Sequence, residues 1–188
     1  HGTGDDPLRL PRSARGLLAA ALAADLARPI LLLTARPDRL LTLQEELGSW
    51  ASDLRVLTFA SPSPLFYEKE PWGRRTIHQR IEVLAELAQD DGHEVKGLVI
   101  LAAAKGLITR TLSPSQFRHH TRQLQRGATA RYESLLQELV RSGYRPESLV
   151  VERGQFSRRG GILDLWPPAD AAPTRLEFFG DEIDSMRR

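Results

Sequence analysis

Apolar and polar residues alternate most clearly near the end of the chain. Residues 162–166 (ILDLW) and 175–179 (RLEFF) predict two β-strands, joined by a connection rich in proline and alanine. The pair Gly160 and Gly161 predicts a bulge or tight turn before the first of these strands. Neighbouring side chains of a strand point to opposite sides, so Phe178 and Phe179 cannot fill the same core. One of these two rings is therefore predicted to be exposed.

Continuous apolar runs predict a different architecture for the first hundred residues. The runs at 30–34, 55–59 and 97–101 predict buried strands, and they alternate with predicted helices at 13–27, 37–50 and 74–89. This alternation is typical of an α/β fold, in which helices sandwich a parallel sheet. Between the second strand and the third helix, the loop 61–73 carries Phe66, Tyr67 and Trp72. These rings, with Lys69 nearby, either stack on nucleic-acid bases or, more commonly, cover the end of a sheet.

The composition of the sequence changes after residue 104. Residues 109–127 are rich in Thr, Ser, Gln, Arg and His, and an amphipathic helix is predicted at 132–140, ended by Ser142 and Gly143. We therefore expect two domains, an α/β domain over residues 1–109 and a small α+β domain over residues 110–188.

Composition excludes several classes of protein. The 188 residues include no cysteine, which excludes a disulfide framework and a thiolate metal site. No apolar run reaches the length of a membrane span and no charged leader opens the chain, so we expect a cytoplasmic protein with no membrane partner. The net charge of +2 is too balanced to indicate nucleic-acid binding by itself. Arginine supplies most of the positive charge of the second half, which suits a protein partner as well as DNA.

Two arginines are candidates for a binding patch. Arg159 lies just before one predicted strand and Arg175 opens the other, so pairing of the strands would place both near an exposed phenylalanine. Arginine and aromatic residues are enriched at the energetic centres of protein interfaces. The alternative interpretation is that these arginines only solvate the edge of a sheet.

The runs ERGQFSRRGGILDLWPP and RLEFFGDEID resemble the second domain of the UvrB family and of the UvrB-homology module of the bacterial transcription-repair coupling factor (Mfd). The resemblance implies a fragment that binds UvrA and recruits it to stalled RNA polymerase. It also implies that UvrA contacts fall on Arg159, Arg175 and Phe179, with Arg158 and Gly160 beside them. In such a protein, other domains engage RNA polymerase and DNA, and the motor uses ATP and Mg²⁺.

A phosphate-binding loop of the form GxxGxGK[ST] opens the UvrB family, and the matching stretch here is RLPRSARG. Around Ser13, Arg12 occupies a glycine position, Arg15 replaces the lysine, and Gly16 replaces the hydroxyl residue that would hold Mg²⁺. The first domain is thus expected to be a degenerate P-loop NTPase-like domain that binds no cofactor and no metal and has no catalytic residue. His119 and His120 are interpreted as a solvated pair. The alternative function is a fragment of a UvrB-like excision-repair helicase subunit that binds DNA and nucleotide.

Overall fold

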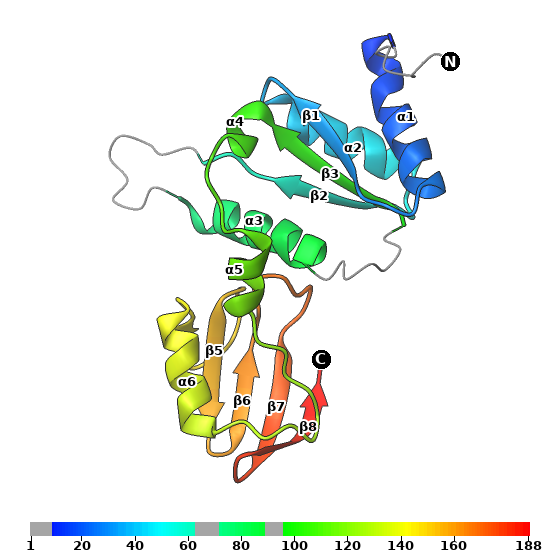
Figure 1. Cartoon of the computed structure of the whole chain (residues 1–188). Helices are drawn as coiled ribbons and strands as arrows, with labels where there is room; N and C mark the ends of the chain where they lie inside the picture. Colours follow the sequence, from blue (N-terminus) through cyan, green and yellow to red (C-terminus); the bar gives the residue numbers. More distant parts are fainter. Residues whose placement is uncertain (1–8, 63–71, 89–95) are drawn as a thin grey trace. The chain divides into compact units, whose positions relative to one another are not determined.

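Three parallel strands form the sheet of the first half of the chain (Figure 1). The computed structural model describes residues 9–62, 72–88 and 96–188. The strands are β1 (Ile30–Thr34), β2 (Arg55–Phe59) and β3 (Leu98–Ala103), in the order β1-β3-β2. Every residue of β3 is buried because it has a strand on both sides and helices on both faces.

Helices cover the two faces of this sheet. One face packs against α1 (Arg12–Asp25) and α2 (Arg39–Trp50), through Ala23 and Leu47, and the other packs against α3 (Arg74–Ala88), through Val83. The short helix α4 (Ala104–Leu107) follows β3. The predicted α/β fold with a parallel sheet between helices is confirmed. The predicted helices lie within a few residues of the observed ones, and the end predicted at Gln89 lies outside the described residues.

The predicted burial of β1 is wrong. Leu31 and Leu33 are 51% and 52% exposed, whereas Ile30 and Leu32 pack against the core beneath α1 and α2. β1 is an edge strand of the sheet, and the core on the α3 side is built from β2, β3 and α3. The side chains of β1 that point to the α3 side therefore remain half exposed.

A buried arginine lies at the end of β2. Arg80 of α3 is 2% exposed, and it donates hydrogen bonds of 3.0 Å to the carbonyl oxygens of Ala60 and Gly106. Its guanidinium lies 3.9 Å from the ring centroid of Phe59 and 4.9 Å from that of Trp72. Burial lowers the pKa of Arg80. The guanidinium thus joins the ends of β2 and β3 to α3.

Of the aromatic residues predicted in the loop 61–73, Trp72 is described and stacks on this arginine. Phe66, Tyr67 and Lys69 lie outside the described residues.

The second half of the chain forms a sheet of five strands with one long helix on one face (Figure 1). Its strands follow one another in sequence order: β4 (Arg145–Pro146), β5 (Gln155–Arg159), β6 (Ile162–Leu165), β7 (Thr174–Phe179) and β8 (Glu182–Arg187). β4 is parallel to β5, and all other pairs are antiparallel. The helices are α5 (Pro114–His119) and α6 (Tyr132–Arg141). The two strands predicted from sequence are β6 and β7; β4, β5 and β8 were not predicted.

The core of this half lies between α6 and the sheet. Leu135 and Leu139 of α6 meet Leu163 and Leu176 of the sheet, and all four are buried. The helix ends as predicted, since Gly143 has a φ of +86°, a value that favours glycine. By its contacts, the chain divides into the units His1–Thr111 and Leu112–Arg188.

Candidate functional site

One face of the second sheet is open, and we call the face opposite α6 the open face. Residues directly opposite each other in antiparallel strands share a face, and successive residues alternate between faces. Leu163, Leu176 and Ile183 are fully buried on the α6 side. Ile162, Asp164, Arg175 and Glu177 alternate with the buried leucines and therefore point to the open face. With the residues paired opposite them and the pair Phe179 and Glu182, the open face consists of Ser157, Arg159, Ile162, Asp164, Arg175, Glu177, Phe179, Glu182, Ser185 and Arg187.

Arg175 is held on the open face by Asp164, which lies opposite it on β6. Its Nε donates to Asp164 Oδ1 at 2.7 Å and its Nη2 donates to Oδ2 at 2.8 Å. This bidentate hydrogen bonding lowers the pKa of Asp164, with a smaller contribution from the charge of Arg159, and it raises the pKa of Arg175. The side chain of Arg175 is still 50% exposed, so it is oriented and accessible at once.

Arg159 lies on the other side of Asp164, on β5. Its Nη2 donates to the main-chain oxygen of Ser148 at 3.0 Å, which orients the side chain along the edge of the sheet. The charge of Arg159 acts on Asp164, so one carboxylate lies between the two arginines. A partner surface with acceptor oxygens would therefore meet two oriented guanidinium groups.

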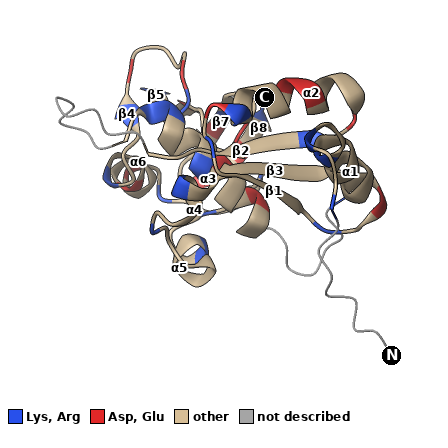
Figure 2. Ribbon diagram, turned by 90° about the horizontal axis from the view of Figure 1, so that it is seen from above, with Lys and Arg blue, Asp and Glu red and all other residues tan. Residues whose placement is uncertain are grey.

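A second ion pair continues the open face toward β8. Arg187 donates to Glu177 Oε2 at 3.1 Å, and the hydroxyl of Ser185 donates to the same oxygen at 2.7 Å. Arg187 and Ser185 were missed in the sequence analysis because β8 was not recognised. Figure 2 shows this mixture of signs, since β7 carries both basic and acidic residues.

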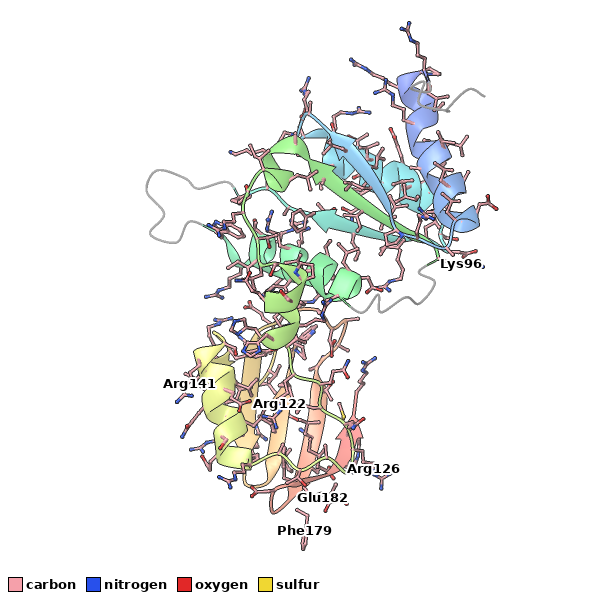
Figure 3. All side chains as sticks on the ribbon, viewed as in Figure 1. Lys96, Arg122, Arg126, Arg141, Phe179 and Glu182 are labelled. Carbon is pink, nitrogen blue, oxygen red and sulfur yellow. The ribbon has the colours of Figure 1, made fainter. Side chains whose placement is uncertain are left out.

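Phe179 marks the end of the open face. Phe179 is 85% exposed and projects from the end of β7 (Figure 3). Phe178 points to the core side, where its ring lies 4.9 Å from that of Tyr132 in an edge-to-face arrangement. The prediction that one of the two rings is exposed is confirmed.

The turn between β5 and β6 lies at the same end of the sheet as the turn between β7 and β8 (Figure 1), and β7 ends at Phe179. Gly160 has a φ of +58°, a conformation that glycine adopts without strain. A Cβ atom on Gly161 would lie 2.9 Å from the carbonyl oxygen of Phe178. The predicted tight turn is present, and it lies close against β7 because Gly161 has no side chain.

Arg158 points away from the open face. It is the neighbour of Arg159 on β5 and lies on the α6 side, with its Nη1 3.7 Å from Glu133 Oε1 of α6. The structure therefore brings Arg159, Arg175 and Phe179 to one face, with Gly160 at its margin, and it leaves Arg158 on the other face.

The stretch that matches a phosphate-binding loop is helical from Arg12 onward. Arg12, Ser13, Arg15 and Gly16 belong to the first turns of α1. Gly16 is buried, and a Cβ atom on it would lie 3.0 Å from the ring of Trp50. Gly16 thus allows α1 to lie close to α2, which is a packing role.

Within residues 9–62, 72–88 and 96–188, no cluster of three or more His, Cys, Asp or Glu side chains is arranged to hold a metal ion. The rings of His119 and His120 lie edge to face, 5.3 Å apart. None of the described helices combines the length and apolarity that crossing a membrane requires.

Comparison with known proteins relates both halves of the chain to one family. Residues 123–188 match the family model of the UvrB interaction domain. The chain is 29% identical over 184 residues to the transcription-repair-coupling factor of Escherichia coli, a match that covers 95% of this chain and 15% of that protein. It is 32% identical over 178 residues to that of Mycobacterium tuberculosis, covering 94% of the chain and 14% of the relative. The factor of Bacillus subtilis is 30% identical over 179 residues, with coverage of 95% and 15%.

The chain thus spans about 15% of the length of the curated relatives it matches. Nearly all of its own residues take part in these matches. The chain therefore belongs to the transcription-repair-coupling factor family, as a fragment that contains a UvrB interaction domain.

Proposed function

We propose that this fragment is a binding module for UvrA and that it docks through the open face. The observation that supports the proposal is the placement of Arg159, Arg175 and Phe179 on a single sheet face. An exposed ring beside oriented guanidinium groups is the combination that protein interfaces favour at their centres. The polar remainder of the face suits a partner that is bound and released, since obligate interfaces are more hydrophobic.

The ion pairs within the open face reduce the cost of binding. A free arginine loses rotamer entropy when a partner immobilises it, at roughly 0.5–1.5 kcal/mol for a flexible side chain. Asp164 and Ser148 already orient Arg175 and Arg159, so part of this cost is met before the partner arrives. The chemistry of the face also defines the partner's surface, which should present carboxylates or carbonyl oxygens to the arginines and an apolar pocket to Phe179.

In the whole protein, this module would act by resembling UvrB. It would present a UvrB-like docking face to UvrA while other parts of the protein engage RNA polymerase and DNA. The module would thereby bring excision repair to a stalled polymerase. We propose that it has no ATPase activity and works in the cytoplasm as an adaptor.

The experiment uses neighbouring arginines on β5 as a matched pair. Binding of UvrA to the 188-residue chain is measured by calorimetry for wild type, Arg159→Glu, Arg175→Glu and Arg158→Glu. Reversal at Arg159 or Arg175 should weaken binding about thirtyfold or more. Arg158→Glu makes the same change of charge on the opposite face and should leave the affinity within about twofold.

Two outcomes would count against the proposal. Equal losses for Arg158→Glu and Arg159→Glu would mean that UvrA senses net charge and not this face. Wild-type affinity for Arg175→Glu would mean that the open face is not the docking surface.

The absence of ATPase activity has its own test. Arg15 stands where the family motif has lysine, and Gly16 stands where it has the hydroxyl that ligates Mg²⁺. Titration of the chain with Mg²⁺ and ATP should give no binding heat at micromolar to millimolar nucleotide. Micromolar binding would support the alternative, a fragment of a nucleotide-binding UvrB-like subunit.

A further inference from the structure

A groove lies at the edge of the second sheet, between α6 and the outer edge of β5. It has a volume of about 680 Å³. Its apolar lining comes from Leu136, Val140, Pro146 and Phe156, and Val140 is 54% exposed. The groove thus combines an apolar surface with the edge of a strand.

The edge of β5 is covered over only part of its length. β4 pairs with Gln155 and Phe156, and no strand of the described chain pairs with the outer edge of β5 beyond Phe156. The carbonyl of Phe156 points outward, because it accepts a 2.8 Å hydrogen bond from the amide of Glu147. Main-chain groups alternate in direction along a strand, so the N–H and C=O of Arg158 also point outward, into the groove. This edge can pair with an added strand.

The charges at the rim indicate the chemistry of such a strand. Both glutamates of the groove lie near arginines, since Glu133 is 3.7 Å from Arg158 and Glu147 is 4.0 Å from Arg145. Arg141, at the end of α6, also lines the groove and has no salt bridge to an acidic residue of the described chain. The groove is thus lined by Arg141, Arg158 and Arg159 against Glu133 and Glu147, so its rim has a positive excess, which favours acidic side chains on the incoming segment.

The same charges disfavour a second copy of this chain as the occupant. Strand pairing between two β5 edges would bring the consecutive Arg158 and Arg159 of one copy near those of the other. Like charges opposite each other in a sheet are destabilising. Charged residues at an edge are a common protection against self-association of this kind.

We propose that this groove binds an extended, acidic segment of a partner protein, which adds as a strand beside β5. Main-chain hydrogen bonds to Arg158 would supply the pairing, and apolar side chains of the segment would lie on Val140 and Leu136. Acidic side chains would meet Arg158 and Arg141 at the rim. The groove is a second docking surface that adjoins the open face at Ser157 and Arg159 and differs from it in Arg158 and the side chains of α6, which lie on the other side of the sheet.

The test uses a synthetic peptide pool of defined chemistry. Peptides of about eight residues, in which apolar residues alternate with Asp or Glu, are titrated into the isotope-labelled 188-residue chain. Amide signals of residues 157–159 and of the last turn of α6 should shift, with dissociation constants below about 1 mM. A matched pool with Lys in place of the acids should bind about tenfold more weakly.

Variants then locate the binding. Val140→Glu places a like charge in the groove at an exposed position and should weaken the acidic peptides about tenfold. Phe179→Ala, on the open face, is the matched control and should leave their affinity unchanged. Two peptides are then compared, one methylated on the odd-numbered main-chain nitrogens and one on the even-numbered ones. Only one of the two should lose binding, because only one set of amides faces β5.

Three results would overturn the proposal: no shift at residues 157–159 with any acidic peptide, equal binding of the Lys pool, or full affinity in Val140→Glu. Shifts that appear without peptide, as the concentration of the chain rises, would identify a second copy as the occupant and would also overturn it. None of these outcomes depends on whether UvrA binds the open face.

Discussion

Replacement of Phe179 by alanine tests the placement of the open face most directly. Phe179 is 85% exposed, whereas its neighbour Phe178 packs edge to face on Tyr132. The two phenylalanines are adjacent and chemically identical, so their variants differ only in the face from which a ring is removed. We expect Phe179→Ala to weaken UvrA binding without a loss of stability, and Phe178→Ala to destabilise the second unit.

The magnitude follows from the exposed surface. An aromatic side chain buries roughly 200 Å² when it is fully covered, and 85% of Phe179 remains to be covered by a partner. At about 25 cal/mol per Å², complete burial of that surface contributes up to about 4 kcal/mol. Binding never recovers the whole of this term, so we expect a loss of about 2 kcal/mol, or roughly thirtyfold in the dissociation constant.

The assay combines calorimetry with UvrA and urea unfolding followed by NMR signals of each unit. Phe179→Ala should unfold within about 0.5 kcal/mol of wild type, because surface changes seldom exceed that value. Phe178→Ala should lose about 2 kcal/mol or more, since it leaves a cavity beside Tyr132. If Phe179→Ala bound UvrA as tightly as wild type, or lost as much stability as Phe178→Ala, the assignment of the open face would be refuted.

Three further predictions concern stability. The pKa of Asp164 is lowered in the folded state, so its ion pair stabilises the second unit above the unfolded-state pKa of about 4, and this stabilisation is lost as the pH falls through the folded-state pKa. In Asp164→Asn, the urea midpoint of the second unit should therefore depend less steeply on pH between about pH 5 and 2 than in wild type. An unchanged slope of midpoint against pH would contradict this. Arg80→Met should destabilise the first unit by about 2 kcal/mol or more, because it removes the hydrogen bonds to three main-chain carbonyls, those of Ala60, Gly106 and Thr109. A stabilised variant would show that burial of the guanidinium costs more than its hydrogen bonds contribute. Gly160→Ala should cost about 1 kcal/mol for its positive φ, and Gly161→Ala should cost more, because its Cβ would lie 2.9 Å from the oxygen of Phe178; the reverse order in urea unfolding would contradict the turn geometry.

Local patterns were sufficient to predict the first sheet. The bounds predicted for β1 and β2 agree with the structure, because continuous apolar runs and amphipathic helices leave a clear signal over short stretches. The burial of each strand could not be predicted from these local patterns. The runs ILLLT of β1 and LVILAA of β3 are similarly apolar, yet only β3 is fully buried. Strand order decides which run is central, and order depends on contacts between residues far apart in the sequence.

The second sheet shows why β8 was missed. Its pairing with β7 contains a bulge between Glu177 and Phe178, which breaks the alternation of side chains along the hairpin. The run EIDSMR also has few apolar residues, since only Ile183 is fully buried. Because β8 was not predicted, the predicted binding patch did not include Arg187 or its contact with Glu177.

The separation of Arg158 from Arg159 could have been predicted. The alternation of side chains along a strand, which separates Phe178 from Phe179, applies equally to two consecutive arginines at the end of a strand. It was not applied because β5 itself was not recognised, its run QFSRR having a single strongly apolar residue. If the hairpin around Gly160 and Gly161 had been recognised, the residues before it would have been predicted as a strand with alternating side chains. That strand would have placed the two arginines on opposite faces.

The ion pair on the open face explains how an arginine can be both internally bonded and available. Asp164 occupies Nε and one terminal nitrogen of Arg175, and the guanidinium fork has further N–H groups on its exposed side. A partner's oxygen can bind there without displacing Asp164, so the face keeps its geometry during docking. If orientation matters more than net charge, removal of the carboxylate in Asp164→Asn weakens UvrA binding even though it makes the face more positive. If net charge dominates, the same variant binds an acidic partner more tightly, and the sign of the change separates the two effects.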